Sequence, residues 1–248
     1  MLIRLLVLLC VLLPLEVSAQ VALDTSTEQQ SSNAGSVTWS HTISGSDRFL
    51  LVGCTNSDTL TWSATYNSVS MGTPIINADP NRPLVLWGLV APATGANNIV
   101  VSWTDGNREP YCIASSYTGV DQSTPYDTPP APTDAGGTST SLNVTSATND
   151  MVVDYAVMSV GVTTLTVTAG GQTELQQQVG NAAPGNAMGS SYKAGATTTT
   201  MSWSWSGFSS YNQWGINLNA AGAPPASTCT GGMLTMGAGI KCHERELR

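Results

Sequence analysis

Positive charge is scarce in this chain. Lysine occurs only at Lys193 and Lys241, charged residues make up 10% of the 248 residues, and the formal net charge is −8. A nucleic-acid-binding protein needs a basic surface to neutralise phosphates, and attraction to an anionic membrane surface needs the same charge. The composition therefore argues against nucleic acid as a partner. It leaves a neutral polymer such as a polysaccharide, or another surface protein.

Residues that commonly build catalytic sites are also few. His41 is the only histidine outside the C-terminal end, and no Gly-x-Ser-x-Gly sequence occurs. The Glu-x-Asp-x-x-Glu pattern of laminarinase-type glycosidases is absent as well. His41 shares a predicted strand face with Val37, Trp39 and Ile43, which predicts a buried structural imidazole. Asp154, inside the apolar segment MVVDYAV, is expected to be a hydrogen-bonded strand residue or to face outward.

No segment after the N-terminus repeats its apolar residues at helical spacing. Apolar residues instead alternate with period two, and Gly, Pro, Asn and Asp separate the runs. This predicts an all-β fold, a single large antiparallel β-sandwich of jelly-roll or lectin-like type with about a dozen strands; two small domains are the alternative. The predicted strands are 36–43, 48–55, 60–66, 83–90, 98–103, 111–118, 140–144, 151–158, 163–168, 188–193, 198–205 and 213–219.

The two ends of the chain differ from this body. Residues 1–19 have the basic start, apolar run and small-residue end of a secretory signal peptide. The apolar run is about 11 residues, against about 20 for a spanning helix, so no membrane span is expected after cleavage. The sequence thus predicts a secreted or cell-surface protein with a lead segment at 20–35, a sandwich at 36–219, and a Pro/Gly-rich linker with a cysteine-containing tail at 220–248.

Four cysteines remain after signal cleavage, and an even number in an exported protein indicates disulfides. The favoured pairs are Cys54–Cys112 within the body and Cys229–Cys242 within the tail. Two separate buried thiols at Cys54 and Cys112 are the alternative.

Two oxygen-rich turns are candidates for calcium. Asp105, Asn107 and Glu109 alternate along one turn, and residues 77–81 (NADPN) form a similar one. Neither matches an EF-hand loop, and ordinary turn chemistry explains both. The sequence requires no cofactor, with calcium as the alternative.

Aromatic residues cluster near the end of the body. Trp203 and Trp205 lie on one face of a predicted strand, and Tyr211 and Trp214 follow closely. Exposed indoles of this kind can stack on sugar rings. Since the chain has only two phenylalanines, packing between the sheets is the favoured use of these side chains.

Four strings resemble a recurrent β-sandwich module of exported bacterial proteins and phage tail or surface proteins: GSDRFLLVG (45–53), PATGANNIVV (92–101), SYTGVD (116–121) and NDMVV (149–153). The resemblance covers roughly residues 36–219 and implies the fold, but it implies no catalytic residues. The expected function is a non-catalytic secreted or surface-exposed module with a structural, adhesive or interaction role. A carbohydrate-binding protein using exposed tryptophans is the first alternative, and a secreted hydrolase, which would need two acids or His41 with an acid in one cleft, is the second.

Overall fold

The computed structural model describes residues 19–31, 35–55, 61–78, 83–104, 110–159, 162–179 and 186–222. Residues 19–222 form one compact unit. The described residues form fifteen β-strands, and every pairing between them is antiparallel. The predicted all-β, antiparallel class is therefore confirmed. Because these residues form no helix, none of them makes a helical membrane span.

The strands belong to three sheets, with the orders β1-β9-β3-β7-β6, β2-β8-β4-β5 and β10-β15-β11-β14-β13, the last with β12 paired to β15. Their bounds are β1 Ala22–Gln30, β2 Ser36–Ile43, β3 Phe49–Thr55, β4 Trp62–Tyr66, β5 Val69–Ser70, β6 Ile76–Ala78, β7 Leu84–Val90, β8 Gly95–Trp103, β9 Tyr111–Thr118, β10 Thr133–Thr145, β11 Met151–Met158, β12 Leu165–Val167, β13 Thr173–Gln178, β14 Ala187–Ala194 and β15 Thr198–Leu218.

The long strand β15 takes part in two layers. Its first part, up to residue 206, pairs with β12 and the end of β10, whereas its second part, from residue 209, pairs with β11 and the start of β10. Gly207 has a φ of 76°, a conformation that glycine adopts without steric cost, and the register with β10 shifts at Gly137. The sheet therefore folds back on itself at this bend. The two strands predicted at 198–205 and 213–219 are parts of this one strand.

The two halves of the chain consequently have the same topology. We call β1–β9 the N-terminal sandwich, with an inner layer β1-β9-β3-β7-β6 and an outer layer β2-β8-β4-β5. We call β10–β15 the C-terminal sandwich, whose inner layer is the second part of β15 with β11, β14 and β13. Its outer layer is β10, the first part of β15, and β12. In the inner layers, β9, β3, β7 and β6 correspond in order to the second part of β15, β11, β14 and β13. In the outer layers, β2, β8 and β4 correspond to the end of β10, the first part of β15 and β12.

Local geometry supports a residue-level equivalence. Phe49 and Met151 begin the central strands β3 and β11, and a residue with positive φ, Asp47 or Asn149, lies two positions before each. Two equivalent backbone hydrogen bonds follow: Ala91 N donates to Arg48 O (2.9 Å), and Gly195 N donates to Asp150 O (2.8 Å). Residue 52 is thus equivalent to 154, 53 to 155 and 54 to 156.

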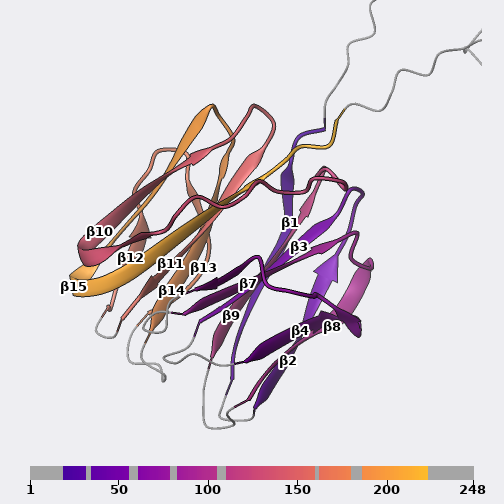
Figure 1. The fold of residues 1–248 in the computed structure, drawn as a ribbon, viewed down its shortest axis with the longest axis horizontal. Helices are drawn as coiled ribbons and strands as arrows, with labels where there is room; N and C mark the ends of the chain where they lie inside the picture. The colour runs from indigo at the N-terminus through magenta and orange to yellow at the C-terminus, as the bar shows by residue number, and fades with distance from the viewer. Residues whose placement is uncertain are drawn as a thin grey trace, which may run out of the picture. The chain divides into compact units, whose positions relative to one another are not determined.

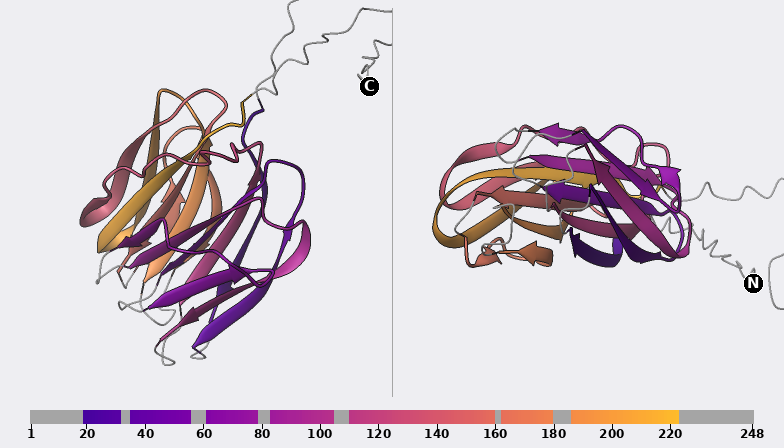
Figure 2. Two further views of the ribbon diagram at one scale, coloured as in Figure 1. Left: turned by 45° about the vertical axis from the view of Figure 1, so that its right-hand side comes forward. Right: turned by 90° about the horizontal axis from the view of Figure 1, so that it is seen from below.

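Three cores separate the four layers. One apolar cluster lies between the two inner layers and contains Phe49, Leu51, Val153 and Ile216. A second lies inside the N-terminal sandwich, and two smaller clusters lie inside the C-terminal sandwich. Figure 1 shows this order, with β2, β4 and β8 on one side, β10, β12 and β15 on the other, and the inner strands between them. In Figure 2 the first and second halves of the chain form separate groups.

Several strands were not predicted from the sequence. The lead segment at 20–35 contains β1, which pairs with β9 along its length, so the sandwich begins before Ser36. The strands β5, β6 and β13 were also missed. β1 and β13 are polar and half-buried, so neither has the apolar alternation that marks a strand. The predicted signal peptide and the tail beyond residue 222 lie outside the described residues, apart from Ala19.

Candidate functional site

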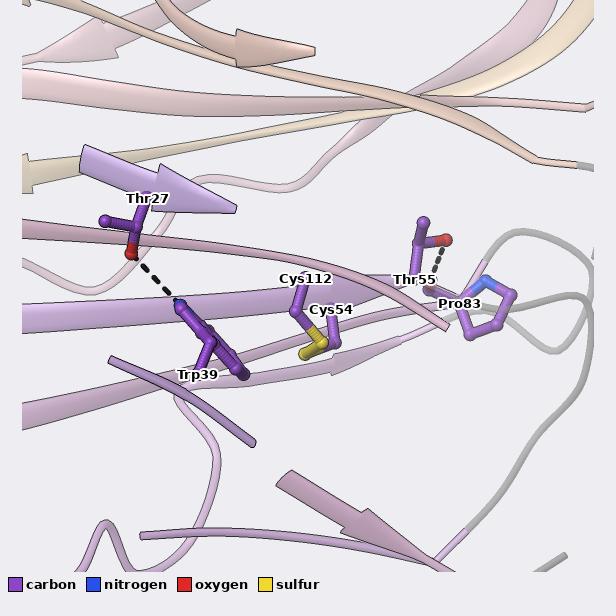
Figure 3. Close-up of a disulfide and its surroundings, with 6 residues drawn as sticks. All are labelled: Thr27, Trp39, Cys54, Thr55, Pro83 and Cys112. Atoms are coloured by element: carbon purple, nitrogen blue, oxygen red, sulfur yellow. Dashed lines mark hydrogen bonds between the residues drawn. A yellow bond between two sulfur atoms is a disulfide. The ribbon is translucent and has the colours of Figure 1, made fainter. Parts of the chain in front are cut away.

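The predicted disulfide of the body is confirmed. Cys54 of β3 and Cys112 of β9 are directly opposite in register and are joined by a bond of 2.05 Å (Figure 3). Both residues are fully buried in the core of the N-terminal sandwich. The second predicted pair, Cys229–Cys242, lies outside the described residues.

His41 is a buried structural residue, as predicted. It is completely inaccessible and faces the core on β2. Its Nδ1 lies 2.8 Å from Thr27 Oγ1, which also accepts a hydrogen bond from Trp39 Nε1 (Figure 3). Burial lowers the pKa of His41 to about 4, against a smaller opposing effect of Asp24. The imidazole is therefore neutral near pH 7 and inaccessible to a substrate.

Asp24 of β1 lies in the same sandwich and is hydrogen-bonded to hydroxyl groups. Its carboxylate accepts hydrogen bonds from Ser44 N, Ser44 Oγ and Ser116 Oγ, at 2.9, 2.5 and 2.9 Å. Burial raises the pKa of Asp24, but these hydrogen bonds outweigh burial and lower it overall. Asp24 and His41 do not form a catalytic pair, because the only side-chain partner of the His41 ring among the described residues is Thr27.

Asp154 is the centre of a buried polar network in the C-terminal sandwich. It is fully buried and accepts hydrogen bonds from Ser191 Oγ, Trp203 Nε1 (2.8 Å) and Gln213 Nε2 (2.7 Å). Burial raises its pKa to about 6, although the three hydrogen bonds act in the opposite direction. The prediction of a hydrogen-bonded strand residue is confirmed. The network joins β11, β14 and both parts of β15.

The tryptophans of β15 do not form the sugar-stacking surface that the sequence offered as an alternative. Trp203, Trp205 and Tyr211 are 0%, 6% and 7% exposed, and they pack in one apolar cluster with Ala156 of β11 and Ala187 of β14. Trp214 is half-buried and packs against the core between the two inner layers. Core packing, the favoured reading of these side chains, is what the structure shows. The exposed aromatic residue of this region is Phe208, at 78%.

The predicted calcium turn at Asp105, Asn107 and Glu109 lies outside the described residues, as do residues 79–81 of the second candidate turn. Among the described residues, no group of three or more His, Cys, Asp or Glu side chains could hold a metal ion.

The surface feature that the two sandwiches share is an uncharged outer face rich in hydroxyl groups. The N-terminal hydroxyl face is formed by every second residue of β2, the residues between them facing the core. Side chains of β8 and β4 lie beside these residues in register. Its members are exposed or half-buried: Ser36, Thr38, Ser40, Thr42, Ser63, Thr65, Asn98, Val100 and Ser102.

The C-terminal hydroxyl face has the same character. Its side chains come from the end of β10, the first part of β15 and β12, again in register. Some are paired on the surface, as where Thr200 Oγ1 donates to Asn143 Oδ1 at 2.7 Å. Its members are Ser139, Ser141, Asn143, Thr145, Thr166, Thr198, Thr200, Ser202 and Ser204. Neither group of residues includes a charged side chain.

Comparisons of the chain with protein-family models, with curated proteins and with solved structures found no match. The functional proposal therefore rests on the chemistry and geometry of this chain.

Proposed function

We propose that this chain is an exported, non-catalytic module with an adhesive or structural role, which contacts neutral hydroxyl-rich polymers through its two hydroxyl faces. The observation that carries the proposal is the presence of two chemically similar, uncharged faces on the outer layers of a four-layer stack. Because the inner layers pack against each other, these faces point away from each other. A molecule with two such faces can bridge two polymer chains.

The chemistry of the faces fits a neutral partner. A hydroxyl group both donates and accepts hydrogen bonds, as the hydroxyls of a polysaccharide do. Removing these groups from water on binding costs far less than desolvating charges. The large apolar side chains exposed among the described residues are Val69, Val90 and Phe208, and none of them belongs to either face. A contact dominated by hydrogen bonds is therefore the mode that these faces support.

The buried positions of His41 and Asp154 support a non-catalytic role, because neither group can reach a substrate in this structure. Export is supported by the signal-like pattern of residues 1–19 and by the Cys54–Cys112 disulfide, since structural disulfides persist in oxidising compartments.

The test compares one-face and two-face variants. Thr38→Asp with Ser40→Asp places charge on the N-terminal face, and Ser141→Asp with Asn143→Asp places charge on the C-terminal face. Thr94→Asp, at an exposed position outside both faces, is the control for added surface charge, with one aspartate where each face variant has two. Binding to insoluble neutral polysaccharides is measured by co-sedimentation, and bridging by the aggregation of polysaccharide-coated particles.

We expect each one-face variant to keep binding but to lose particle aggregation, because bridging needs both faces. Loss of the second contact should weaken the overall affinity by about tenfold or more. The variant charged on both faces should lose binding, and Thr94→Asp should behave as the unaltered chain. Full binding by a folded variant with both faces charged would overturn the proposal.

A further inference from the structure

The end of β15 carries a cluster of oxygen atoms around one buried amide. The Asn217 side chain is 1% exposed, and its Nδ2 lies close to three oxygens. These are Asp127 Oδ2 at 3.1 Å, Asp150 Oδ2 at 2.9 Å and Asn219 Oδ1 at 2.9 Å. An amide nitrogen has only two hydrogens, so one of the three oxygens receives none.

The other end of the same amide is unsatisfied. Asn217 Oδ1 is buried and has no hydrogen-bond partner among the described residues. A buried acceptor without a partner is unfavourable, and such groups are few in folded proteins. The Asn217 amide thus has too many acceptors at its nitrogen and no donor at its oxygen. A cation held among these oxygens would offset the charge of the two carboxylates and, once the amide turns, would give Oδ1 a partner.

The remaining contacts position the two carboxylates without neutralising them. Asp150 Oδ1 accepts from Ala220 N, and Asp150 Oδ2 accepts from Ala147 N, both at 2.9 Å. Asp127 Oδ1 accepts from Asn219 Nδ2 at 3.1 Å. All of these donors are neutral. Two carboxylates therefore converge on one point, and no described residue in contact with either is positively charged.

The N-terminal sandwich shows the equivalent place with different chemistry. Asp24 follows a residue of β1 that pairs with the end of β9, and Asp127 follows Tyr126, which pairs with the end of β15. The position of the second acid, Asp150, is occupied by Arg48, which directly precedes β3 as Asp150 precedes β11. The N-terminal sandwich thus has one carboxylate and one arginine at these two positions, whereas the C-terminal sandwich has two carboxylates.

The partners of the acid differ in the same way. Asp24 is satisfied by the hydroxyls of Ser44 and Ser116. In the C-terminal sandwich, the residue equivalent to Ser116 is Asn217, whose carbonyl oxygen is the unpartnered atom. The excess of negative charge and the orphaned oxygen are therefore specific to the C-terminal copy.

We propose that these four residues, Asp127, Asp150, Asn217 and Asn219, form a calcium-binding site. Calcium takes carboxylate and amide oxygens at about 2.3–2.6 Å in flexible geometry and completes its shell with water. The three oxygens now lie 2.9–3.1 Å from Asn217 Nδ2, so an ion can take this place only when the amide turns its nitrogen away and the oxygens move slightly inward. Asp127 is exposed, which gives the ion access from solvent. The site ties the connection between the two sandwiches to β15 and to the turn before β11.

The test is isothermal titration calorimetry of the full chain, freed of metal with a chelator, with calcium chloride. We expect one saturable site with a dissociation constant of about 10⁻⁴–10⁻³ M, typical of extracellular modules, and a rise in melting temperature. Magnesium should bind more weakly, because it demands a stricter octahedral geometry.

Variants distinguish this site from other acids. Asp127→Asn and Asp150→Asn should each weaken calcium binding at least about tenfold, as expected when a charged ligand is lost. Asp24→Asn, the matched change in the N-terminal sandwich, should leave binding unchanged, as should Asp105→Asn in the oxygen-rich turn. Because Asp127 is exposed, its variant should fold even if Asp150→Asn does not. The proposal fails if the chain binds no calcium, or if binding survives Asp127→Asn or depends on Asp105.

Discussion

The two sandwiches join their central strands with different chemistry at equivalent positions. In the N-terminal sandwich, Cys54 of β3 is bonded to Cys112 of β9. The equivalent pair in the C-terminal sandwich is Ala156 opposite Gln213, and Gln213 Nε2 donates to Asp154 instead. One half thus holds its middle with a covalent bond through an apolar core, and the other uses a buried carboxylate. The same strand order therefore tolerates two unrelated ways of linking the strands at its centre.

The difference extends to the response of each half to pH. The N-terminal core contains an imidazole that burial keeps neutral, whereas the C-terminal core contains a carboxylate whose ionised form burial disfavours. Acid should destabilise the first half by protonating His41, and it should stabilise the second by protonating Asp154. The pH ranges overlap, so the two effects oppose each other in the unaltered chain.

The largest effect is expected from removing the covalent link. Replacing both cysteines, Cys54→Ala with Cys112→Ala, removes a cross-link between residues 58 positions apart. Chain-entropy arithmetic for that separation gives a loss of roughly 4 kcal/mol in the free energy of unfolding. Urea unfolding of the oxidised chain and the variant measures the difference. A loss below about 1 kcal/mol would show that this bond contributes little beyond packing.

His41→Phe should remove the acid sensitivity of the N-terminal sandwich. The folded chain holds the pKa of His41 at about 4, below its ordinary value of 6.5, so the unfolded chain binds a proton that the folded chain excludes. Stability from this group is complete above pH 6.5 and is lost as the pH falls towards 4, on the order of 3 kcal/mol in all. The variant should become more stable than the unaltered chain by that amount across this range. Parallel pH profiles of the two proteins would contradict this account.

Asp154→Asn should have the opposite consequence. The folded pKa of about 6 lies above the ordinary 3.8, so the folded chain binds the proton more tightly and stability falls as the pH rises from 3.8 to 6. The loss is on the order of 3 kcal/mol. The variant keeps the side-chain shape, but its free energy of unfolding should lack this dependence on pH. The acid sensitivity caused by His41 should then be seen alone. Urea unfolding of both proteins at several pH values measures this difference.

Sequence reasoning reached the fold class because the central strands carry strong signals. β3, β9 and β11 are buried on both faces and read as apolar runs, and β2 alternates throughout. The repeated topology was not evident from the sequence, because equivalent residues such as Cys54 and Ala156 share no chemistry. Strands such as β13 (TELQQQ) have no periodic signal, since they lie half-buried at a sheet edge.

The candidate functional residues also divide into those that the sequence could predict and those that it could not. The sequence placed His41 in the core and paired Cys54 with Cys112, because each depends on one strand pattern or on cysteine number. It could not find the cluster around Asn217, because its members come from three segments that only the folded chain brings together. It also left the tryptophans of β15 with two readings. Alternation says which residues share a face, but it does not say which face is covered.

The smallest effect should come from the contact between the two halves. Gly53 of β3 lies against Tyr155 of β11, its equivalent in the other sandwich, so these two positions meet between the inner layers. A Cβ at Gly53 would lie 2.6 Å from Tyr155 Cε1, and the ring is fully buried and cannot swing away. Gly53→Ala should therefore cost about 1–3 kcal/mol by overpacking, measured by urea unfolding.

A control variant and a rescue variant test whether residues 53 and 155 are in direct contact. Gly170→Ala, at a glycine with nothing within 4 Å of the added carbon, should change stability by only a few tenths of a kcal/mol. Tyr155→Leu shortens the side chain opposite, so adding Gly53→Ala to it should cost less than Gly53→Ala does alone. That non-additivity is the signature of direct contact. Strictly additive effects would mean that residues 53 and 155 do not meet, and that the two sandwiches are held together by the other residues of that core.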